Sequence, residues 1–199
     1  MEQIISKEEL AKIKNIKGEI RGTVVKIIGE YVLLKEGENG LNKLDDLMRS
    51  LDCSTEYRKI NKVIFLPTWL VVVSFLATKR LFNFTNEDFQ KMGEMDVKIS
   101  PFLKIFIKYF VSLKKLEEAV PKMWNNFLPD VKVELTEFNE KEKYSIMKLD
   151  NFDLSENCCQ YFIGFANTLT RMIGRENFVC EETKCTFRGD DHHEFKLKW

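Results

Sequence analysis

Apolar residues recur at helical spacing through the first part of the chain. From Ile20 to Leu34 they are mostly three or four positions apart, which places them on one helical face. The same spacing returns from Leu41 to Leu51, after Gly37 and Gly40 interrupt it. We therefore expect two helices that form an N-terminal hairpin.

The most apolar stretch of the chain runs from Val63 to Thr78, and Lys62 and Lys79 bound it. A membrane-spanning helix needs roughly 20 apolar residues, and this stretch is shorter and contains a proline. We expect a buried central helix over about Pro67–Leu81 and no membrane span. A further helix is expected to begin at Pro101, because proline is favoured in the first turn of a helix.

Alternation of apolar and polar residues replaces the helical spacing after residue 129. It predicts two strand pairs on either side of one helix, in the segments Val131–Leu135, Tyr144–Lys148, Asn157–Ile173, Phe178–Phe187 and His193–Trp199. The length of 199 residues fits one domain. The predicted fold class is α+β: a helical part of about 1–129 packs on a four-stranded antiparallel sheet with a ββαββ arrangement over about 130–199.

Composition and charge narrow the possible partners and the compartment. Lys plus Arg equals Asp plus Glu at 31 each, so no net field attracts the chain to phosphate backbones, and we expect no nucleic-acid binding. The N-terminal segment lacks the basic and apolar pattern of a secretory signal. We expect a cytoplasmic protein whose five cysteines are thiols or metal ligands.

Cys159, Glu182, Cys185 and His193 are expected to converge at one end of the predicted sheet. Two thiolates, one carboxylate and one imidazole suit a tetrahedral zinc ion. Glu182 and Cys185 are an odd number of positions apart, so the strand between them must bend or bulge for both to face the same point. Spacing alone leaves a second interpretation open, in which the cysteines are buried apolar residues and the other two face solvent.

The same region resembles the 4-vinyl reductase domain family, whose motif has a cysteine, a glycine, a Glu-x-x-Cys sequence, a second glycine and a last cysteine. The matching residues here are Cys159, Gly164, Glu182, Cys185 and Gly189. Aromatic-sensing members of that family bind zinc at these positions, so the resemblance implies a metal-binding role for Cys159, Glu182 and Cys185. His193 stands in the place of the last cysteine, and His192 is the alternative fourth ligand.

The superfamily around that domain also contains heme-based nitric-oxide sensors and subunits of the TRAPP Golgi transport particle. The heme sensors use an axial histidine on a helix before the first strand pair. This chain has two histidines, His192 and His193, and neither precedes the predicted strands. We therefore expect zinc and no heme.

A ligand pocket is expected between the buried helix and the aromatic helix that follows it, a common location for apolar cavities. The predicted lining is Trp69, Phe65, Phe106, Tyr109, Phe110 and Trp124. No histidine or carboxylate pair is evident among these helices, so the expected ligand is apolar or aromatic, and the Trp124 indole could donate a hydrogen bond to it. Close packing without any ligand is the alternative.

These patterns together favour a small-molecule sensing or binding domain with structural zinc that acts through a protein partner or as a homodimer. The alternative is an interaction scaffold of the transport-particle type, and a heme-based gas sensor is the less favoured further alternative. We do not expect an enzyme, because zinc catalysis needs an open coordination position and four protein ligands close the shell.

Overall fold

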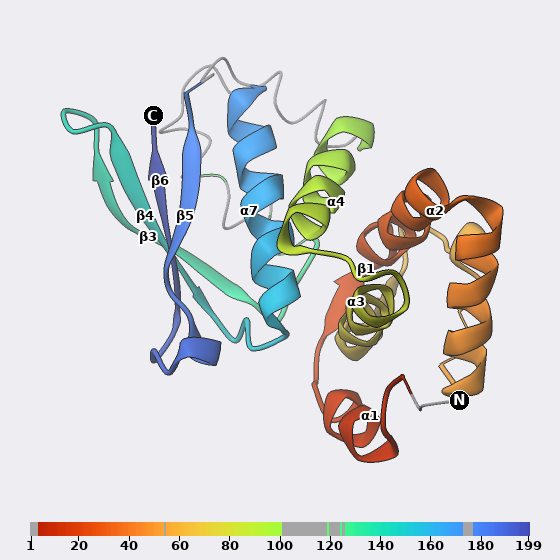
Figure 1. Ribbon diagram of the computed structural model, residues 1–199. Helices are drawn as coiled ribbons and strands as arrows, with labels where there is room; N and C mark the ends of the chain where they lie inside the picture. Colours follow the sequence, from red (N-terminus) through yellow and green to blue (C-terminus); the bar gives the residue numbers. More distant parts are fainter. Residues whose placement is uncertain (1–3, 54, 101–118, 120–123, 125, 173–176) are drawn as a thin grey trace.

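The computed structural model describes residues 4–53, 55–100, 119, 124, 126–172 and 177–199. A four-stranded sheet forms one side of the molecule, helix α7 covers it, α4 lies beside α7, and the remaining helices lie beyond (Figure 1). The helices are α1 (Lys7–Lys14), α2 (Gly22–Ser50), α3 (Thr68–Phe82), α4 (Asn86–Ile99) and α7 (Glu156–Arg171). The predicted α+β class, with a helical N-terminal part, is confirmed.

The larger sheet is antiparallel, with the strand order β3-β4-β6-β5. Its strands are β3 (Lys132–Asn139), β4 (Tyr144–Asp150), β5 (Val179–Lys184) and β6 (His193–Lys198). Alternate side chains of β6, namely His193, Phe195 and Leu197, are buried under α7 and the segments around it. The ββαββ arrangement therefore forms as the alternation predicts, with the first residue of β6 held in the interior.

Strand β5 contains the predicted irregularity. Glu182 pairs with Phe195 and Lys184 pairs with Glu194, so one residue, Thr183, is extra on β5. Such a bulge bends a strand and re-aims the side chains that follow it. The bulge therefore lets Glu182 and Cys185 face the same point although they are an odd number of positions apart.

Helices α4 and α7 approach each other closely at two glycines. A Cβ atom at Gly164 would overlap the carbonyl oxygen of Gln90, and a Cβ at Gly93 would overlap that of Tyr161. Glycine is the residue that permits such backbone contact. The apolar residues of α7 are consequently buried both against the sheet and against α4, which explains why nearly all of this helix is buried.

The two predicted N-terminal helices are present, and a short strand precedes them. Residues 22–50 form two helical segments, together labelled α2, that meet at a kink at Gly37, whose φ of 71° and ψ of −169° are not helical, while Gly40 stays helical. Ile20 lies in a short strand, β1 (Glu19–Arg21), which pairs with β2 (Phe65–Pro67). Here the pairing of β1 with the distant strand β2 decides the backbone conformation of Ile20. The spacing of apolar residues indicates only which side chains are buried, so it did not separate this strand from the helix that follows.

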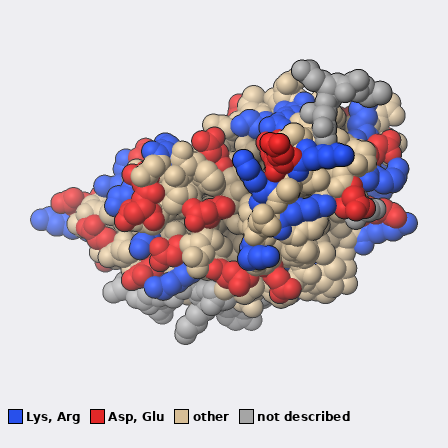
Figure 2. Space-filling view, turned by 90° about the horizontal axis from the view of Figure 1, so that it is seen from below, with Lys and Arg blue, Asp and Glu red and all other residues tan. Residues whose placement is uncertain are grey.

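The remaining helical predictions are met in part. The buried helix α3 begins at Thr68, close to the expected start, and most of its residues are buried. The helix expected at Pro101 lies outside the described residues. Among the described helices, none has the length and apolarity needed to cross a membrane. Basic and acidic side chains are interspersed on the face in Figure 2, in line with the zero formal net charge.

Candidate metal centre and neighbouring cavity

The structure brings Cys159, Glu182, Cys185 and His193 together, with one ligand atom of each within 4.8 Å of the other three. Cys159 lies in the first turns of α7, whose start is fixed by the Ser155 side chain accepting a hydrogen bond from a backbone amide. Glu182 is near the end of β5 and His193 begins β6. The bulge then brings Cys185 to the same point.

The spacing of these atoms fits a single tetrahedral ion. The His193 Nδ1 atom lies 3.6 Å from the Cys159 Sγ and 3.1 Å from the Glu182 Oε1. Zinc bonds of roughly 2.0–2.3 Å place tetrahedral ligand atoms about 3.3–3.8 Å apart. Small movements of the side chains would therefore complete a zinc site, and the soft thiolates with one imidazole are ligands that zinc favours.

A hydrogen bond orients the His193 ring. Its Nε2 atom lies 2.9 Å from the Thr186 Oγ1, and the Phe152 and Phe187 rings flank the imidazole at 5.4 and 5.7 Å between centroids. With Nε2 donating to Thr186, the lone pair of Nδ1 points at the cluster. Metal-binding histidines are commonly held in this way by a partner on the other ring nitrogen.

The side chains in this cluster are buried. Cys159, Cys185 and His193 are each at most 2% exposed. Burial raises the pKa of the Cys159 thiol, and the Glu182 carboxylate raises it further. Burial also raises the pKa of Glu182, but hydrogen bonds with His193 and the two cysteines outweigh it and the net shift is downward. A bound cation would favour both thiolates, so metal binding would release protons.

A tight loop after β5 holds Cys185 in place. The Asp190 carboxylate accepts a hydrogen bond from the Cys185 amide at 2.8 Å, and Gly189 supplies the left-handed conformation at φ 96° that the turn needs. The Arg188 Nη1 atom lies 3.6 Å from the Glu182 Oε2 atom. Sequence reasoning missed Thr186, Arg188 and Asp190, although Gly189 marked a turn there.

His192 is not part of the cluster. Its Nδ1 atom lies 2.6 Å from the Asp191 carboxylate, and its Nε2 atom lies 3.8 Å from Glu194. Adjacent strand residues point to opposite faces, so only one of the two histidines can face α7. That residue is His193.

Replacing Thr186 with valine is expected to weaken zinc binding by roughly 10- to 100-fold, because the His193 ring loses the partner that fixes its orientation. Competition with a chromophoric chelator measures this affinity. The matched control is Thr183→Val: its hydroxyl bonds Glu194 instead, at 2.7 Å, outside the cluster. Equal affinities for both variants and the wild type would show that Thr186 does not position the ligand.

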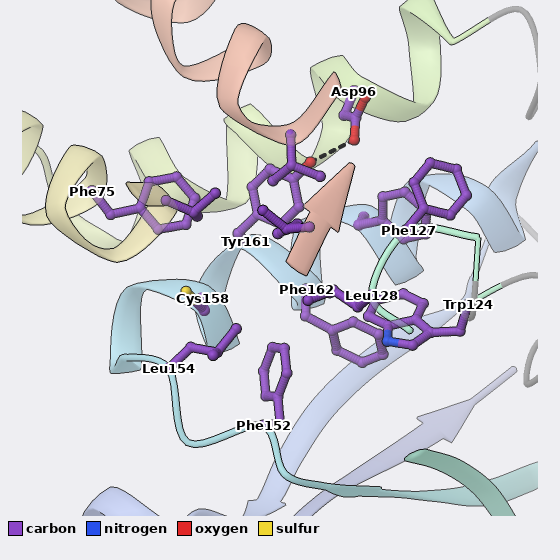
Figure 3. A pocket seen from close by; sticks show the side chains of 14 residues that line it. Phe75, Asp96, Trp124, Phe127, Leu128, Phe152, Leu154, Cys158, Tyr161 and Phe162 are labelled. Atoms are coloured by element: carbon purple, nitrogen blue, oxygen red, sulfur yellow. Dashed lines mark hydrogen bonds between the residues drawn. The ribbon is translucent and has the colours of Figure 1, made fainter. Parts of the chain in front are cut away.

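An apolar cavity lies close to the cluster, and Figure 3 shows the side chains that line it. Its volume is about 30 Å³. The lining residues are Ile20, Val24, Val71, Phe75, Asp96, Trp124, Phe127, Leu128, Phe152, Leu154, Cys158, Tyr161, Phe162 and Phe165. Phe152 lines the cavity and also contacts the His193 ring, so the cavity and the cluster share a wall.

Polar groups are few in this cavity. The Tyr161 hydroxyl donates to the Asp96 carboxylate at 2.5 Å, and burial raises the pKa of Asp96 to about 6. The Trp124 indole Nε1 is buried, and among the described residues it has no hydrogen-bond partner. An unpaired buried donor costs free energy, so it marks a place where a ligand acceptor would be stabilised.

The predicted pocket residues fall into three groups. Trp124 lines the cavity. Phe65 is 37% exposed on β2, and Trp69 is half-buried beneath Lys14, so neither lines the cavity. Phe65 belongs to strand β2, whereas Trp69 belongs to α3, so the two residues do not share a helical face. Phe106, Tyr109 and Phe110 lie outside the described residues.

The fold is shared with two groups of solved structures. The H-NOX protein from S. oneidensis in the Fe(II)NO state is similar with a TM-score of 0.68 and 10% identity, over 90% of this chain and 98% of that chain. The Fe(II) unliganded H-NOX protein from K. algicida has a TM-score of 0.65 and 9% identity, over 90% and 96%. A trafficking protein particle complex subunit 3 from Naegleria fowleri, covalently bound to palmitic acid, has a TM-score of 0.50 and 17% identity, over 66% and 93%.

No protein-family profile and no curated protein sequence matches the chain. At these identities the structural likeness establishes the fold alone. That fold is the one expected for the superfamily of heme sensor domains and transport-particle subunits, while membership of the 4-vinyl reductase family stays a prediction.

The likeness to H-NOX proteins runs against the expectation that heme is absent, because H-NOX proteins bind heme. Heme iron is held by histidine, thiolate, methionine or tyrosinate. Neither histidine lines the cavity. Cys158 and Tyr161 do, but Tyr161 donates its proton to Asp96, and the cavity, at about 30 Å³, is far too small for a porphyrin. The described residues therefore do not fit heme, and its absence stays a prediction.

Proposed function

We propose that this protein is a small-molecule-binding domain that senses an apolar or aromatic ligand, holds a structural zinc ion, and signals through a protein partner or a second copy. The zinc would be bound by Cys159, Glu182, Cys185 and His193. The ligand would lie in the cavity beside them. Four protein ligands would fill a tetrahedral shell and leave no open position, which supports a structural rather than a catalytic role for the metal.

The observation that carries the ligand proposal is the Trp124 N–H, which no residue in the described part of the chain accepts, on a cavity wall that is otherwise mostly apolar. An aromatic hydroxyl would accept a hydrogen bond from this indole, and its ring would pack among the Phe162 and Phe165 rings that already contact Trp124 edge-on at 5.1 and 5.9 Å. Ligand pockets of this kind combine an apolar lining with a few placed polar groups.

The cavity must widen for such a ligand to enter. Its volume of about 30 Å³ is well below the roughly 150 Å³ that holds benzene in an engineered protein cavity. Leu154 and Phe152 lie on the segment between β4 and α7, outside regular secondary structure. Movement of this segment would enlarge the cavity and shift Phe152 against His193, so the ligand would act on the metal-bound region.

Phenol is a suitable probe because it combines an aromatic ring with a hydrogen-bond acceptor. We expect Trp124→Phe to weaken phenol binding by about fivefold, since the apolar ring system is largely kept and one hydrogen bond worth about 1 kcal/mol is lost. Isothermal titration calorimetry measures the affinities. Trp69→Phe is the matched control, because Trp69 does not line the cavity. If both variants bind phenol like the wild type, the cavity is not its site.

An interaction scaffold is the second candidate, and the small cavity favours it. In that case the interior would be a filled core, and no aromatic compound would raise the melting temperature. The same titrations separate the two proposals.

A further inference from the structure

A separate groove lies on the surface on the other side of Phe127. Its volume is about 440 Å³, within the roughly 300–1,000 Å³ typical of small-molecule sites. The lining residues are Arg21, Thr23, Lys62, Val63, Ile99, Ser100, Asn126 and Phe127. Among the described residues, two cations and no carboxylate line it. Its charge therefore complements an anion.

Arg21 is held in a fixed position in this groove. Its Nε atom donates to the Asn126 carbonyl and its Nη1 atom donates to the Val63 carbonyl, both at 2.8 Å. The guanidinium lies 4.4 Å from the centre of the Phe65 ring. Guanidinium has five N–H donors, so donors remain after these contacts, and none of its described partners is a carboxylate.

Lys62 adds a second positive charge at the same groove. Its ammonium lies 3.4 Å from the Glu30 carboxylate, and both side chains are partly exposed, at 43% and 29%. Exposed ion pairs of this kind are weak, at about 0–1 kcal/mol, so Lys62 is able to reorient toward a bound anion.

The groove also carries apolar surface that the fold leaves exposed. Val63 is 69% exposed and Ile99 is 36% exposed. Phe127, which is buried, separates the groove from the inner cavity and lines both. Exposed apolar surface beside fixed cations is suited to a molecule with an anionic head and an apolar body.

We propose that this groove binds an amphipathic carboxylate, such as a medium-chain fatty acid. Its carboxylate pairs with the Arg21 guanidinium, which offers the forked geometry that carboxylates accept, and with Lys62. Its apolar chain lies against Val63, Ile99 and Phe127. The site is distinct from the zinc cluster and does not require a ligand in the inner cavity.

Decanoate is the probe, with decanol as the neutral control of equal chain length. Calorimetry on the full chain is expected to show decanoate binding at least about tenfold more tightly than decanol. Lys62→Gln should weaken decanoate binding about threefold or more, and Val63→Asp about tenfold or more, because the aspartate repels the carboxylate within the groove. Both positions are exposed enough to leave the fold intact.

Leu34→Asp is the matched control, since Leu34 is 72% exposed and does not line the groove. Decanoate affinity should be unchanged in this variant. Equal binding of decanol and decanoate, equal effects of Leu34→Asp and Val63→Asp, or protein capture only by vesicles containing phosphatidylserine, would each overturn the proposal. The proposal would also be overturned if decanoate binding disappeared when the protein is diluted to the monomer, because the groove would then be an interface with a second copy of the chain.

Discussion

Replacing Cys185 with alanine is expected to abolish zinc binding and to lower the free energy of unfolding by about 4 kcal/mol or more. Few substitutions lower the free energy of unfolding by this much. Loss of a bound metal is one way to do so, because metal binding to the folded state contributes directly to the folding free energy. The variant also leaves Glu182 and His193 buried without the cation that would compensate them. Elemental analysis should show a fall from about one zinc per chain to nearly none.

Cys180→Ala is the matched control for this prediction. The Cys180 side chain is as buried as the cluster cysteines, at 4% exposure, but it is not part of the cluster. The control should keep its zinc and lose roughly 1 kcal/mol, as expected for removing a small buried group. If wild-type protein prepared without chelator contains no metal, or if both variants are equally stable, the cluster is a packed group of polar side chains and not a metal site.

Replacing Gly164 with alanine is expected to destabilise the protein by about 3 kcal/mol or more. The new methyl group would overlap the backbone carbonyl of Gln90, and backbone atoms cannot move aside as the end of a flexible side chain does. Helices α4 and α7 would have to separate, and α7 carries Cys159 at the cluster. We therefore also expect weaker zinc binding. Urea denaturation measures the first effect and chelator competition the second.

Gln160→Ala is the control at the same interface. The Gln160 side chain accepts a hydrogen bond from Gln90 at 2.8 Å, and its removal adds no atom between the helices. We expect a loss of about 1 kcal/mol with unchanged zinc affinity. A Gly164→Ala variant as stable as this control would mean that the two helices tolerate separation.

The sequence carried enough information to predict the strand pairs, the helix between them and the irregularity in β5. These features depend on local rules: side chains alternate along a strand, so an odd spacing between Glu182 and Cys185 requires a bulge if both face one point. The bulge at Thr183 follows that rule. The choice of His193 over His192 follows from the same alternation once the inward face of β6 is known.

Other features of the site depended on contacts between distant segments. Thr186 orients His193, yet a threonine in a loop gives no signal of that role in the sequence. Gly164 was noticeable only as part of a motif, and its physical reason, the backbone of α4 beside it, belongs to another part of the chain. Asp96 lines the cavity, and nothing in the sequence indicated that position.

By itself, the amino-acid sequence determined the fold class, the succession of strands and helix along the C-terminal part of the chain, and the residue types able to bind zinc. Periodicity and ligand chemistry are local properties, which is why the sequence sufficed for these. Only the tertiary structure decided that Ile20 lies in a strand paired with residues 65–67, that Phe65 lies outside the cavity, and that Asp96 lines it. The physical reason is that backbone pairing and cavity shape arise from segments far apart in the chain, and their free energies outweigh local preference.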